Sequence, residues 1–335
     1  MNQRDRIVTL AKSLGFQHVR FSPLGEAAHF GAFAQWVTDG HHGTMHYLER
    51  GMEIRRNPRQ RLPAAKTAMV LAMEYDHIRP PRPEGLYGKV AAYAWGRDYH
   101  NLIGKRLKKL KRQLDHAGIA CWGGVDTAPI LERSWATEAG LGFNGKNSVQ
   151  ILPARGSYMF LSVLFLSLEV EPDSPLRDHC GSCIRCLSAC PTDAFAGPHT
   201  LDSTRCIAYW TIENRGTIPE GLRPQFGQWF FGCDDCQTVC PHNVTPPETA
   251  EEDFHPRNAW VDLAELLETD DEVIMERFLG TPLRRPGAPA LKRNACLVLG
   301  NLGDPSAVPL LRKVAAGPSE LVAEHARWAL EQLGG

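Results

Sequence analysis

The sequence lacks a long apolar run and an excess of charge of either sign. Its 335 residues include 37 basic and 38 acidic side chains, so the formal net charge is −1. The longest apolar stretch, at 159–166, is too short to cross a bilayer and favours a buried strand. Because the first residues also lack the apolar core of a signal peptide, we expect a cytoplasmic protein without a membrane segment. Any contact with a polyanion must then come from local basic patches.

Cysteine is plentiful, and its spacing is the most informative feature of the chain. Eight of the ten cysteines form two runs, CGSCIRCLSACP at 180–191 and CDDCQTVCP at 233–241, together with an isolated cysteine at 206. Two-cluster bacterial ferredoxins have this spacing, and in them the fourth cysteine of a run ligates the other cluster. We therefore expect two [4Fe–4S] clusters, one held by Cys180, Cys183, Cys186 and Cys240, the other by Cys190, Cys206, Cys233 and Cys236.

Zinc and disulfides are the alternatives for these cysteines. CxxC pairs often bind zinc, but zinc sites rarely carry the CxxCxxCxxxCP run. Disulfides are typical of short exported chains, and this chain is expected to be neither. The two remaining cysteines, Cys121 and Cys296, lie in an apolar stretch and in a helical pattern, so we expect packing roles for both.

The chain divides into three regions of different sequence texture. Residues 1–170 combine strand-like runs at 67–73 and 158–166 with an amphipathic helical pattern at 102–114, which predicts an α/β or α+β domain. Residues 171–255 hold the cysteine runs and little regular pattern, as expected where metal rather than a large core organises the chain.

Residues 256–335 have an all-helical pattern with a short internal repeat. The segment NACLVLGNLG at 294–303 is echoed by HARWALEQLG at 325–334, with a further predicted helix at 307–314 between them. This arrangement predicts HEAT-like helical pairs, which commonly present a surface to a large partner. The alternative is that the tail only caps the domain before it.

Three segments resemble the epoxyqueuosine reductase family, the cobalamin-dependent iron–sulfur enzymes of the last step of queuosine synthesis in tRNA. Ferredoxin runs alone occur in many oxidoreductases, whereas their combination with the other segments is specific to this family. The segments are AAYAWGRDYHNLIGKRL at 91–107, VDTAPILERSWATEAGLGFNGKNS at 125–148, and the cysteine region with RCIAYWTIENRGTIP at 205–219 and FGCDDCQTVCPHN at 231–243.

The resemblance implies a fold, cofactors and an activity. It implies a cobalamin-binding domain at 1–170, a ferredoxin-like domain with two [4Fe–4S] clusters at 171–255 and a HEAT-like tail at 256–335. Electrons from an external low-potential donor would pass through the clusters to cobalamin. Epoxyqueuosine at the anticodon wobble position of tRNA would thereby be reduced to queuosine, and we expect the enzyme to be a monomer.

The resemblance also implies that Asp126, the aspartate of the VDT motif, is the general acid. The reaction consumes two protons, and a carboxyl group beside an apolar corrin would keep its proton near neutral pH because desolvation favours the neutral form. The residues alone favour a different role, in which Asp126 or Thr127 caps a helix at 130–139. The resemblance favours the acid, and one residue can serve both roles.

The cobalamin contacts are less distinct in the sequence. The segment 98–104, DYHNLIG, departs by one residue from the D-x-H-x-x-G cobalt-ligand motif, so His100 is not expected to bind cobalt, in agreement with the resemblance. Each candidate contact is also explained as an ordinary surface or turn residue. The candidates are Arg56, Asp98, Tyr99, Ser157 and Asp234.

Local basic residues are the candidate RNA contacts. Six Lys and Arg residues between 105 and 112 belong to one predicted helix, where a solvated face is the usual explanation and phosphate contact is the alternative. Arg215, Lys292 and Arg293 are further candidates. The target base lies in the anticodon loop, so moving it into a pocket costs less than opening a duplex.

Two other functions fit the cysteine runs. One is a related corrinoid reductase that acts on a small molecule, as reductive dehalogenases do, although those often carry an export signal and lack such a tail. The other is a non-catalytic electron-transfer protein, which leaves residues 1–170 without a role. A cobalamin-binding titration and an assay on tRNA carrying epoxyqueuosine separate the three functions.

Overall fold

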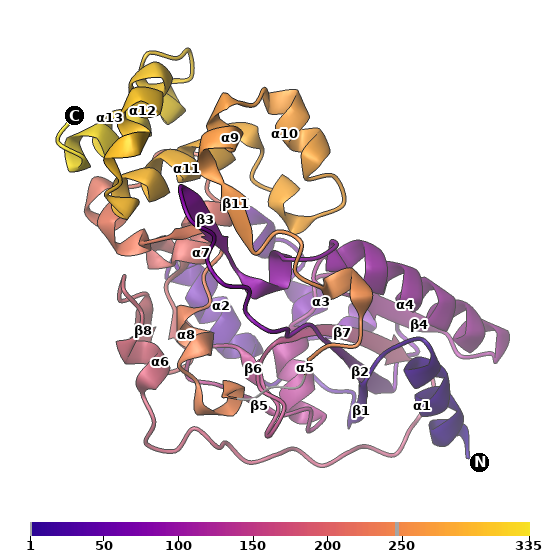
Figure 1. Ribbon diagram of the computed structural model, residues 1–335. Helices are drawn as coiled ribbons and strands as arrows, with labels where there is room; N and C mark the ends of the chain where they lie inside the picture. The colour runs from indigo at the N-terminus through magenta and orange to yellow at the C-terminus, as the bar shows by residue number, and fades with distance from the viewer. Residues whose placement is uncertain (1, 245–247) are drawn as a thin grey trace.

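Figure 1 shows the computed structural model of the protein, which describes residues 2–244 and 248–335. The main sheet and the N-terminal helices lie at one end of the molecule, and the last three helices lie at the other. In this view, the short elements α6 (Arg185–Ser188), β8 (Phe195–Gly197) and α8 (Asp235–Thr238) of the cysteine region lie to the left of the main sheet. The mixed content of helices and strands confirms the predicted class.

The larger sheet has four antiparallel strands, in the order β1 (His18–Pro23), β2 (Thr67–Glu74), β7 (Met159–Leu166) and β4 (Cys121–Gly124). The central strands β2 and β7 are buried along almost their whole length, as expected of continuous apolar runs. The core strands predicted at 67–73 and 158–166 are therefore confirmed.

Helices cover both faces of this sheet. On one face, α1 (Gln3–Ser13) and α4 (Tyr99–His116) share a core with alternate residues of β2, such as Met69 and Leu71. On the other face, α5 (Glu132–Glu138) packs Trp135 against Phe165, with ring centroids 5.2 Å apart. The alternation follows from the two-residue period of a strand. The helix predicted at 102–114 is confirmed, and α4 buries its stripe of Ile103, Leu107, Leu110 and Leu114.

Short elements connect these layers to the cysteine region. Two helices, α2 (Phe30–Thr38) and α3 (Met52–Arg56), lie between β1 and β2 in the chain. A hairpin of β5 (Phe143–Asn144) and β6 (Gln150–Ile151) shares a small core with Cys240. Apart from short 3-10 turns and one strand described next, the regular structure among the described residues of the cysteine region consists of α6 (Arg185–Ser188), β8 (Phe195–Gly197), β9 (Thr200–Leu201), α7 (Ile207–Ile212) and α8 (Asp235–Thr238).

A second sheet joins the three regions of the chain. Its strands are β10 (Trp229–Phe231), β3 (Tyr87–Val90) and β11 (Trp260–Asp262), in that order, and each region contributes one of them. β10 runs parallel to β3, and β11 runs antiparallel to it. One apolar core also extends from Ile7 to Ala329. Regions of different sequence texture therefore fold onto one another.

The C-terminal tail consists of helices around α11 (Ala288–Leu302), which packs against α13 (Glu320–Gln332). Cys296 in α11 is fully buried, as expected of a packing residue, whereas Cys121 at the edge of the main sheet is half-buried. A Cβ atom on Gly300 would lie 2.9 Å from the Cα of Ala329, so glycine is needed where α11 meets α13. The helices are α9 (Leu263–Glu268), α10 (Asp271–Arg277), α11 (Ala288–Leu302), α12 (Val308–Ala315) and α13 (Glu320–Gln332).

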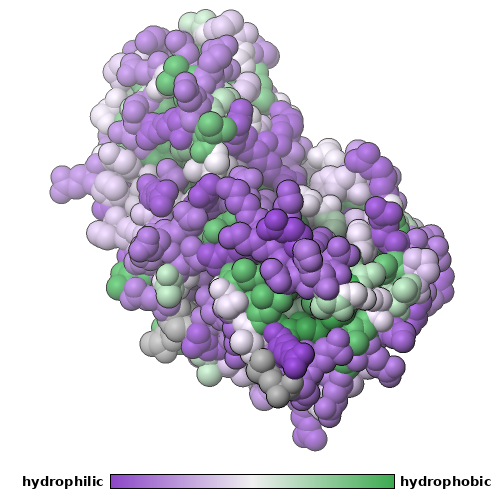
Figure 2. Space-filling view, turned by 90° about the vertical axis from the view of Figure 1, so that its right-hand side faces the viewer, coloured by the Kyte–Doolittle hydropathy of each residue, from purple (hydrophilic) through white to green (hydrophobic). Residues whose placement is uncertain are grey.

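The surface is largely polar. Figure 2 shows that hydrophilic side chains cover most of the face seen from the right-hand side of Figure 1, with smaller apolar areas among them, the most extended of which lies in the lower half of the view. Within residues 2–244 and 248–335, no helix combines the length and the apolar character needed to cross a bilayer.

Candidate functional site

The first group of cysteines consists of Cys180, Cys183, Cys186 and Cys240, which were expected to hold one cluster. Burial raises the thiol pKa of Cys180 and Cys186, and the nearby Cys240 raises both further. Burial also raises the pKa of Cys240, which lies close enough to Cys183 to be affected by its charge. These four thiols are free and near one another. That they bind iron stays a prediction.

The second group lies deeper. Burial raises the thiol pKa of Cys236 well above its usual value, and the charges of Cys206 and Cys190 raise it further. Burial acts in the same way on Cys233, which also responds to Cys206 and Cys236. Thiols with raised pKa values stay protonated at neutral pH, so binding a metal here would release protons.

One hairpin holds the loops of both groups in place. Its turn, between β5 and β6, contributes Lys146, whose Nζ donates hydrogen bonds to the carbonyl oxygens of Gly181 at 2.7 Å and Cys183 at 3.0 Å. The next residue, Asn147, donates from Nδ2 to the carbonyl oxygen of Cys236 at 3.0 Å. The GKN sequence was noted only as part of a family motif, and its bridging position was not predicted.

Asp126 lies on the connection from β4 to α5, with a left-handed backbone angle φ of 54°. Its Oδ2 is 2.8 Å from His100 Nε2 and accepts a hydrogen bond from the Tyr99 hydroxyl at 3.1 Å. The other ring nitrogen of His100, Nδ1, is 2.8 Å from Asp98 Oδ1. An imidazole can donate at both nitrogens only when it is protonated. The geometry therefore favours a charged His100 between two carboxylates.

The electrostatics agree with this arrangement. Burial lowers the pKa of His100, but its hydrogen bonds with Asp126 and Asp98 outweigh this effect and raise the pKa to about 9. Burial raises the pKa of Asp126, but the hydrogen bond and charge of His100 keep that pKa below its usual value. In this arrangement the Asp126 carboxyl favours its ionised form and the proton lies on His100, while the role of Asp126 as the general acid stays a prediction.

Glu132 is a second acid beside Asp126, and it was not predicted. Its Oε1 accepts a hydrogen bond from the backbone N–H of Asp126 at 2.5 Å. Burial and the charge of Asp126 raise the pKa of Glu132 to about 8. In the described chain α5 begins at Glu132, and no side chain caps its first turn. The helix-cap alternative for Asp126 or Thr127 is therefore wrong.

Asp126 and Glu132 lie in the wall of a cavity of about 1060 Å³. Its lining combines apolar side chains, such as Phe33 and Trp36 of α2, with several arginines, including Arg55 and Arg285. The 48% exposure of the Asp126 side chain is exposure to this concave space. Ser203, three positions before Cys206, also lines the cavity, which places the cavity next to the second cysteine group.

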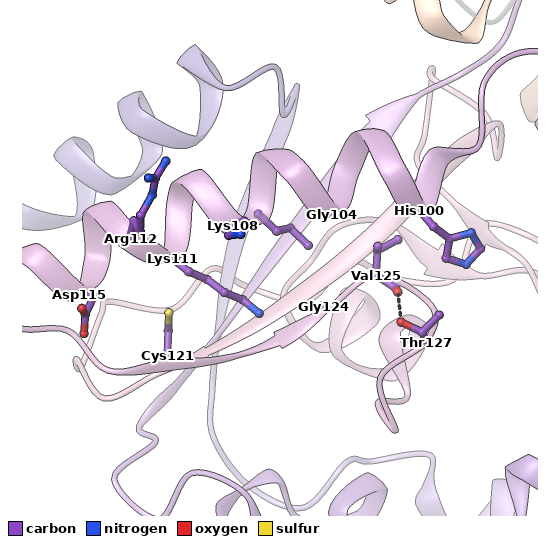
Figure 3. Close-up of a pocket in the computed structure, with 11 residues that line it drawn as sticks. His100, Gly104, Lys108, Lys111, Arg112, Asp115, Cys121, Gly124, Val125 and Thr127 are labelled. Atoms are coloured by element: carbon purple, nitrogen blue, oxygen red, sulfur yellow. Dashed lines mark hydrogen bonds between the residues drawn. The ribbon is translucent and has the colours of Figure 1, made fainter. Parts of the chain in front are cut away.

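A groove beside α4 adjoins this cavity (Figure 3). It has a volume of about 540 Å³ and lies between α4 and β4. Thr127 lines both the groove and the cavity. Lys111 extends from the helix toward the strand, and its Nζ donates to the carbonyl oxygen of Gly123 at 2.5 Å.

The candidate cobalamin contacts lie in different places. Asp98 and Tyr99 join the hydrogen bonds around Asp126 described above. Arg56 pairs with Glu26 at 3.1 Å, and its neighbour Arg55 lines the cavity instead. Among the described residues that line the cavity, none is one of the five candidates.

Ser157 and Asp234 have structural contacts. Asp234 is buried and accepts a hydrogen bond from the backbone N–H of Ala92 at 2.7 Å. Ser157 is also buried; its backbone N–H donates to Asn243 Oδ1 at 2.7 Å, and its hydroxyl lies 2.9 Å from Gln237. Both residues tie the second cysteine run to the N-terminal region.

The candidate RNA contacts differ in accessibility. Arg215 is exposed and donates to the carbonyl oxygen of Arg285 at 2.6 Å, whereas Lys292 is paired with Asp271 at 2.6 Å. Arg293 is fully buried, with 0% of its surface exposed. Its guanidinium donates to the carbonyl oxygens of Trp210, Asn214 and Gly216. The expectation that Arg293 contacts RNA is therefore wrong, because its buried guanidinium is held by backbone carbonyl oxygens in the last turn of α7 and just after it.

The chain matches known proteins over almost its whole length. A family model described as "4Fe-4S double cluster binding domain" matches residues 179–243, and one described as "Epoxyqueuosine reductase QueG, DUF1730" matches residues 55–127. The epoxyqueuosine reductase of Pseudomonas aeruginosa is 41% identical over 96% of this chain and 92% of that protein. The Escherichia coli enzyme of the same name is 35% identical over 95% of this chain and 86% of that protein.

Solved structures give the same result. An epoxyqueuosine reductase bound to an epoxyqueuosine-modified tRNA-Tyr stem loop has a TM-score of 0.92 at 30% identity, covering 99% of this chain and 90% of that chain. The Streptococcus thermophilus enzyme has a TM-score of 0.91 with the same identity and coverage. The Bacillus subtilis epoxyqueuosine reductase also has a TM-score of 0.91, and in that structure a catalytic loop named for its aspartate is swung out of the active site. The chain therefore belongs to the epoxyqueuosine reductase family.

Proposed function

We propose that this protein is an oxidoreductase that reduces epoxyqueuosine to queuosine in tRNA. Relatives of this name match nearly the whole chain, and one of the similar structures holds a modified tRNA stem loop. The observation that carries the proposal is the contact of Asp126, in the wall of a large cavity beside a group of four cysteines, with His100 in the adjoining groove. In this proposal, a proton source would lie next to a path for electrons.

The cysteine groups suit iron–sulfur clusters. Each group offers four thiols, and four cysteine thiolates are the complete ligand set of a [4Fe–4S] cluster. The match of a double-cluster family model to residues 179–243 supports this assignment. Lys146 and Asn147 would keep the two loops in register with each other. An external low-potential donor would supply the electrons.

The large cavity suits cobalamin. Apolar and aromatic side chains, including Phe33, Trp36 and Leu48, would cover the corrin ring. Arg50 and Arg55 line the same space and would meet the phosphate of its nucleotide loop. When bound, cobalamin would supply a reducible cobalt centre able to remove the epoxide oxygen.

The protein's own residues would supply the protons. Conversion of an epoxide to an alkene takes two electrons and two protons and releases the oxygen as water. His100, charged at neutral pH, would deliver one proton through Asp126 to the departing oxygen. Glu132, with a pKa of about 8, would hold the second. Asp98 would keep the imidazole in the orientation that this transfer needs.

An anaerobic assay tests the proposal. Purified protein, loaded with iron, sulfide and cobalamin, is incubated with a low-potential reductant and tRNA carrying epoxyqueuosine at the wobble position. Nucleoside analysis by mass spectrometry is expected to show queuosine in place of epoxyqueuosine. Bound iron should amount to about eight atoms per chain. Zinc in place of iron, or unchanged epoxyqueuosine, would refute the proposal.

A further inference from the structure

The groove beside α4 is a second concave surface of the molecule (Figure 3). Leu107 and Gly124 are among the residues that line it, and His100 and Asp115 lie at its two ends. Its basic side chains come from successive turns of α4, one side of which faces β4. They are Lys108, Lys111 and Arg112.

These side chains give the groove a positive charge. The lining contains these three basic side chains but only one carboxylate among the described residues, that of Asp115 at the far end. Lys108 and Arg112 are exposed, and within residues 2–244 and 248–335 neither forms an ion pair. By contrast, Arg106 on the same helix is paired with Glu251. Unpaired cations along a groove attract a polyanion without regard to its sequence.

The groove leads directly to the proposed reaction site. His100 lines the groove, and its Nε2 contacts Asp126 in the adjoining cavity. Thr127 lines both spaces. A nucleic-acid strand that lies in the groove would therefore present its next base at Asp126, which suits an enzyme that draws a base out of a loop.

Gly104 is an independent sign that something lies against α4. It is in the interior of an 18-residue helix, where glycine is less favourable than alanine. No described atom lies within 4 Å of the position that its Cβ would take. Packing within the protein therefore does not require glycine here, whereas close approach of a ligand backbone would.

We infer that this groove holds the phosphodiester backbone of the tRNA strand next to the modified nucleotide, with Lys108, Lys111 and Arg112 contacting its phosphates. The inference rests on the proposed function, because it takes tRNA as the substrate. It adds the path of the strand and the residues that hold it. The sequence offered phosphate contact as one of two explanations for the basic run at 105–112, and the groove selects Lys108, Lys111 and Arg112 from that run.

Salt-dependent binding tests the inference. The holoenzyme is titrated with an anticodon stem loop carrying epoxyqueuosine at several KCl concentrations. The double variant Lys108→Ala/Arg112→Ala is expected to bind more weakly, and the slope of log K against log salt should fall by roughly 1.4, or about 0.7 for each lost contact. The matched control is Lys105→Ala/Lys109→Ala, which removes the same charge from exposed positions of α4 outside the groove. Its slope should change much less.

A neutral variant separates shape from charge. Gly104→Leu would fill the groove without changing the net charge, and it is expected to weaken binding severalfold while iron content and thermal stability stay unchanged. Gly104→Ala serves as its control, with a smaller effect on binding. Equal loss of affinity in the Lys105/Lys109 and Lys108/Arg112 variants would overturn the inference, as would unchanged binding by Gly104→Leu.

The outcome also distinguishes this inference from the proposed function. If the unmodified enzyme reduces epoxyqueuosine in tRNA while the groove variants bind and react normally, the groove assignment fails and the activity stands. If the unmodified enzyme does not act on the tRNA at all, the proposed function fails first. If the groove variants lose cobalamin instead of RNA, the groove belongs to the cofactor and the inference is wrong.

Discussion

At the residue scale, proton supply depends on a short chain of hydrogen bonds. His100 links Asp98 to Asp126, with 2.8 Å on each side. The VDT motif pointed to Asp126 through the family resemblance. The roles of His100 and Glu132 were not predicted, because they arise where the start of α4 and the start of α5 meet the loop after β4. The spacing of residues in the sequence does not indicate that these segments come into contact.

Replacing Asp126 by asparagine tests its place in this chain. Asparagine tolerates the left-handed backbone of this position, so clusters, cobalamin and fold should be retained. Loss of a group that transfers a proton in the reaction typically costs 10²- to 10⁴-fold in rate, and we expect the single-turnover rate to fall by about that factor. Asp98→Asn changes a side chain that is hydrogen-bonded to His100 and lies one step further along the chain of hydrogen bonds, so it should have a smaller effect. Normal turnover by Asp126→Asn would remove Asp126 from the mechanism.

The pH profile tests the two proton donors together. Both must be protonated to act, and their pKa values are about 9 for His100 and about 8 for Glu132. We expect kcat/KM to be level below both values and to fall as pH rises through them. Glu132→Gln should abolish the lower step and keep the upper one. A profile that rises with pH in this range would contradict the assignment.

The ion pairs of His100 with Asp126 and Asp98 also make the stability of the folded protein depend on pH. The pKa of His100 is raised on folding, so its ion pair stabilises the protein fully below the usual imidazole pKa and ceases to do so as pH rises through about 9. The melting temperatures of the unmodified protein and of His100→Gln should therefore converge at high pH.

Arg293 shows how a charged residue can mislead a prediction from sequence. It follows Lys292 in a basic pair that suggested an RNA contact, yet it is fully buried with three backbone carbonyls as partners. Arg293→Met would leave these acceptors unsatisfied and should lower the free energy of unfolding by about 3 kcal/mol. Lys292→Met, which breaks a partly exposed ion pair, should cost less than about 1 kcal/mol. Chemical denaturation measures both, and equal losses would contradict the structural role.

At the scale of elements, local patterns predicted the regular structure well. Continuous apolar runs predicted β2 and β7, and the three- and four-residue spacing of Ile103, Leu107, Leu110 and Leu114 predicted α4. The β5–β6 hairpin was missed, because strands of two residues leave no periodic signal. Its function depends on two adjacent side chains that reach different loops.

The hairpin therefore offers a test at this scale. Lys146→Met keeps the aliphatic stem and removes the hydrogen bonds to Gly181 and Cys183. We expect this variant to lose iron to a chelator faster than the unmodified protein, as monitored by the decay of cluster absorbance. Lys12→Met, at an exposed position of α1, is the matched control. Equal rates of iron loss in the two variants would show that Lys146 does not support the clusters.

At the scale of the whole molecule, the three regions depend on one another. The β10–β3–β11 sheet takes one strand from each, and one apolar core continues from Ile7 to Ala329. Sequence texture separated the regions but did not predict this sheet, since its strands have only three or four residues. They pair over long separations that no local pattern records. The cavity and the groove likewise form only where α2, the Asp126 loop, α4 and the cysteine region meet.

The most direct measurement is the electron yield of a single turnover. Anaerobic protein with fully reduced clusters and cobalamin is mixed with a substoichiometric amount of stem loop carrying epoxyqueuosine. Cluster absorbance and digested nucleosides are then followed in the same sample. The account predicts that one queuosine appears for every two electrons withdrawn from the protein. Epoxyqueuosine that persists beside fully reduced clusters, or queuosine that forms without their oxidation, would contradict it.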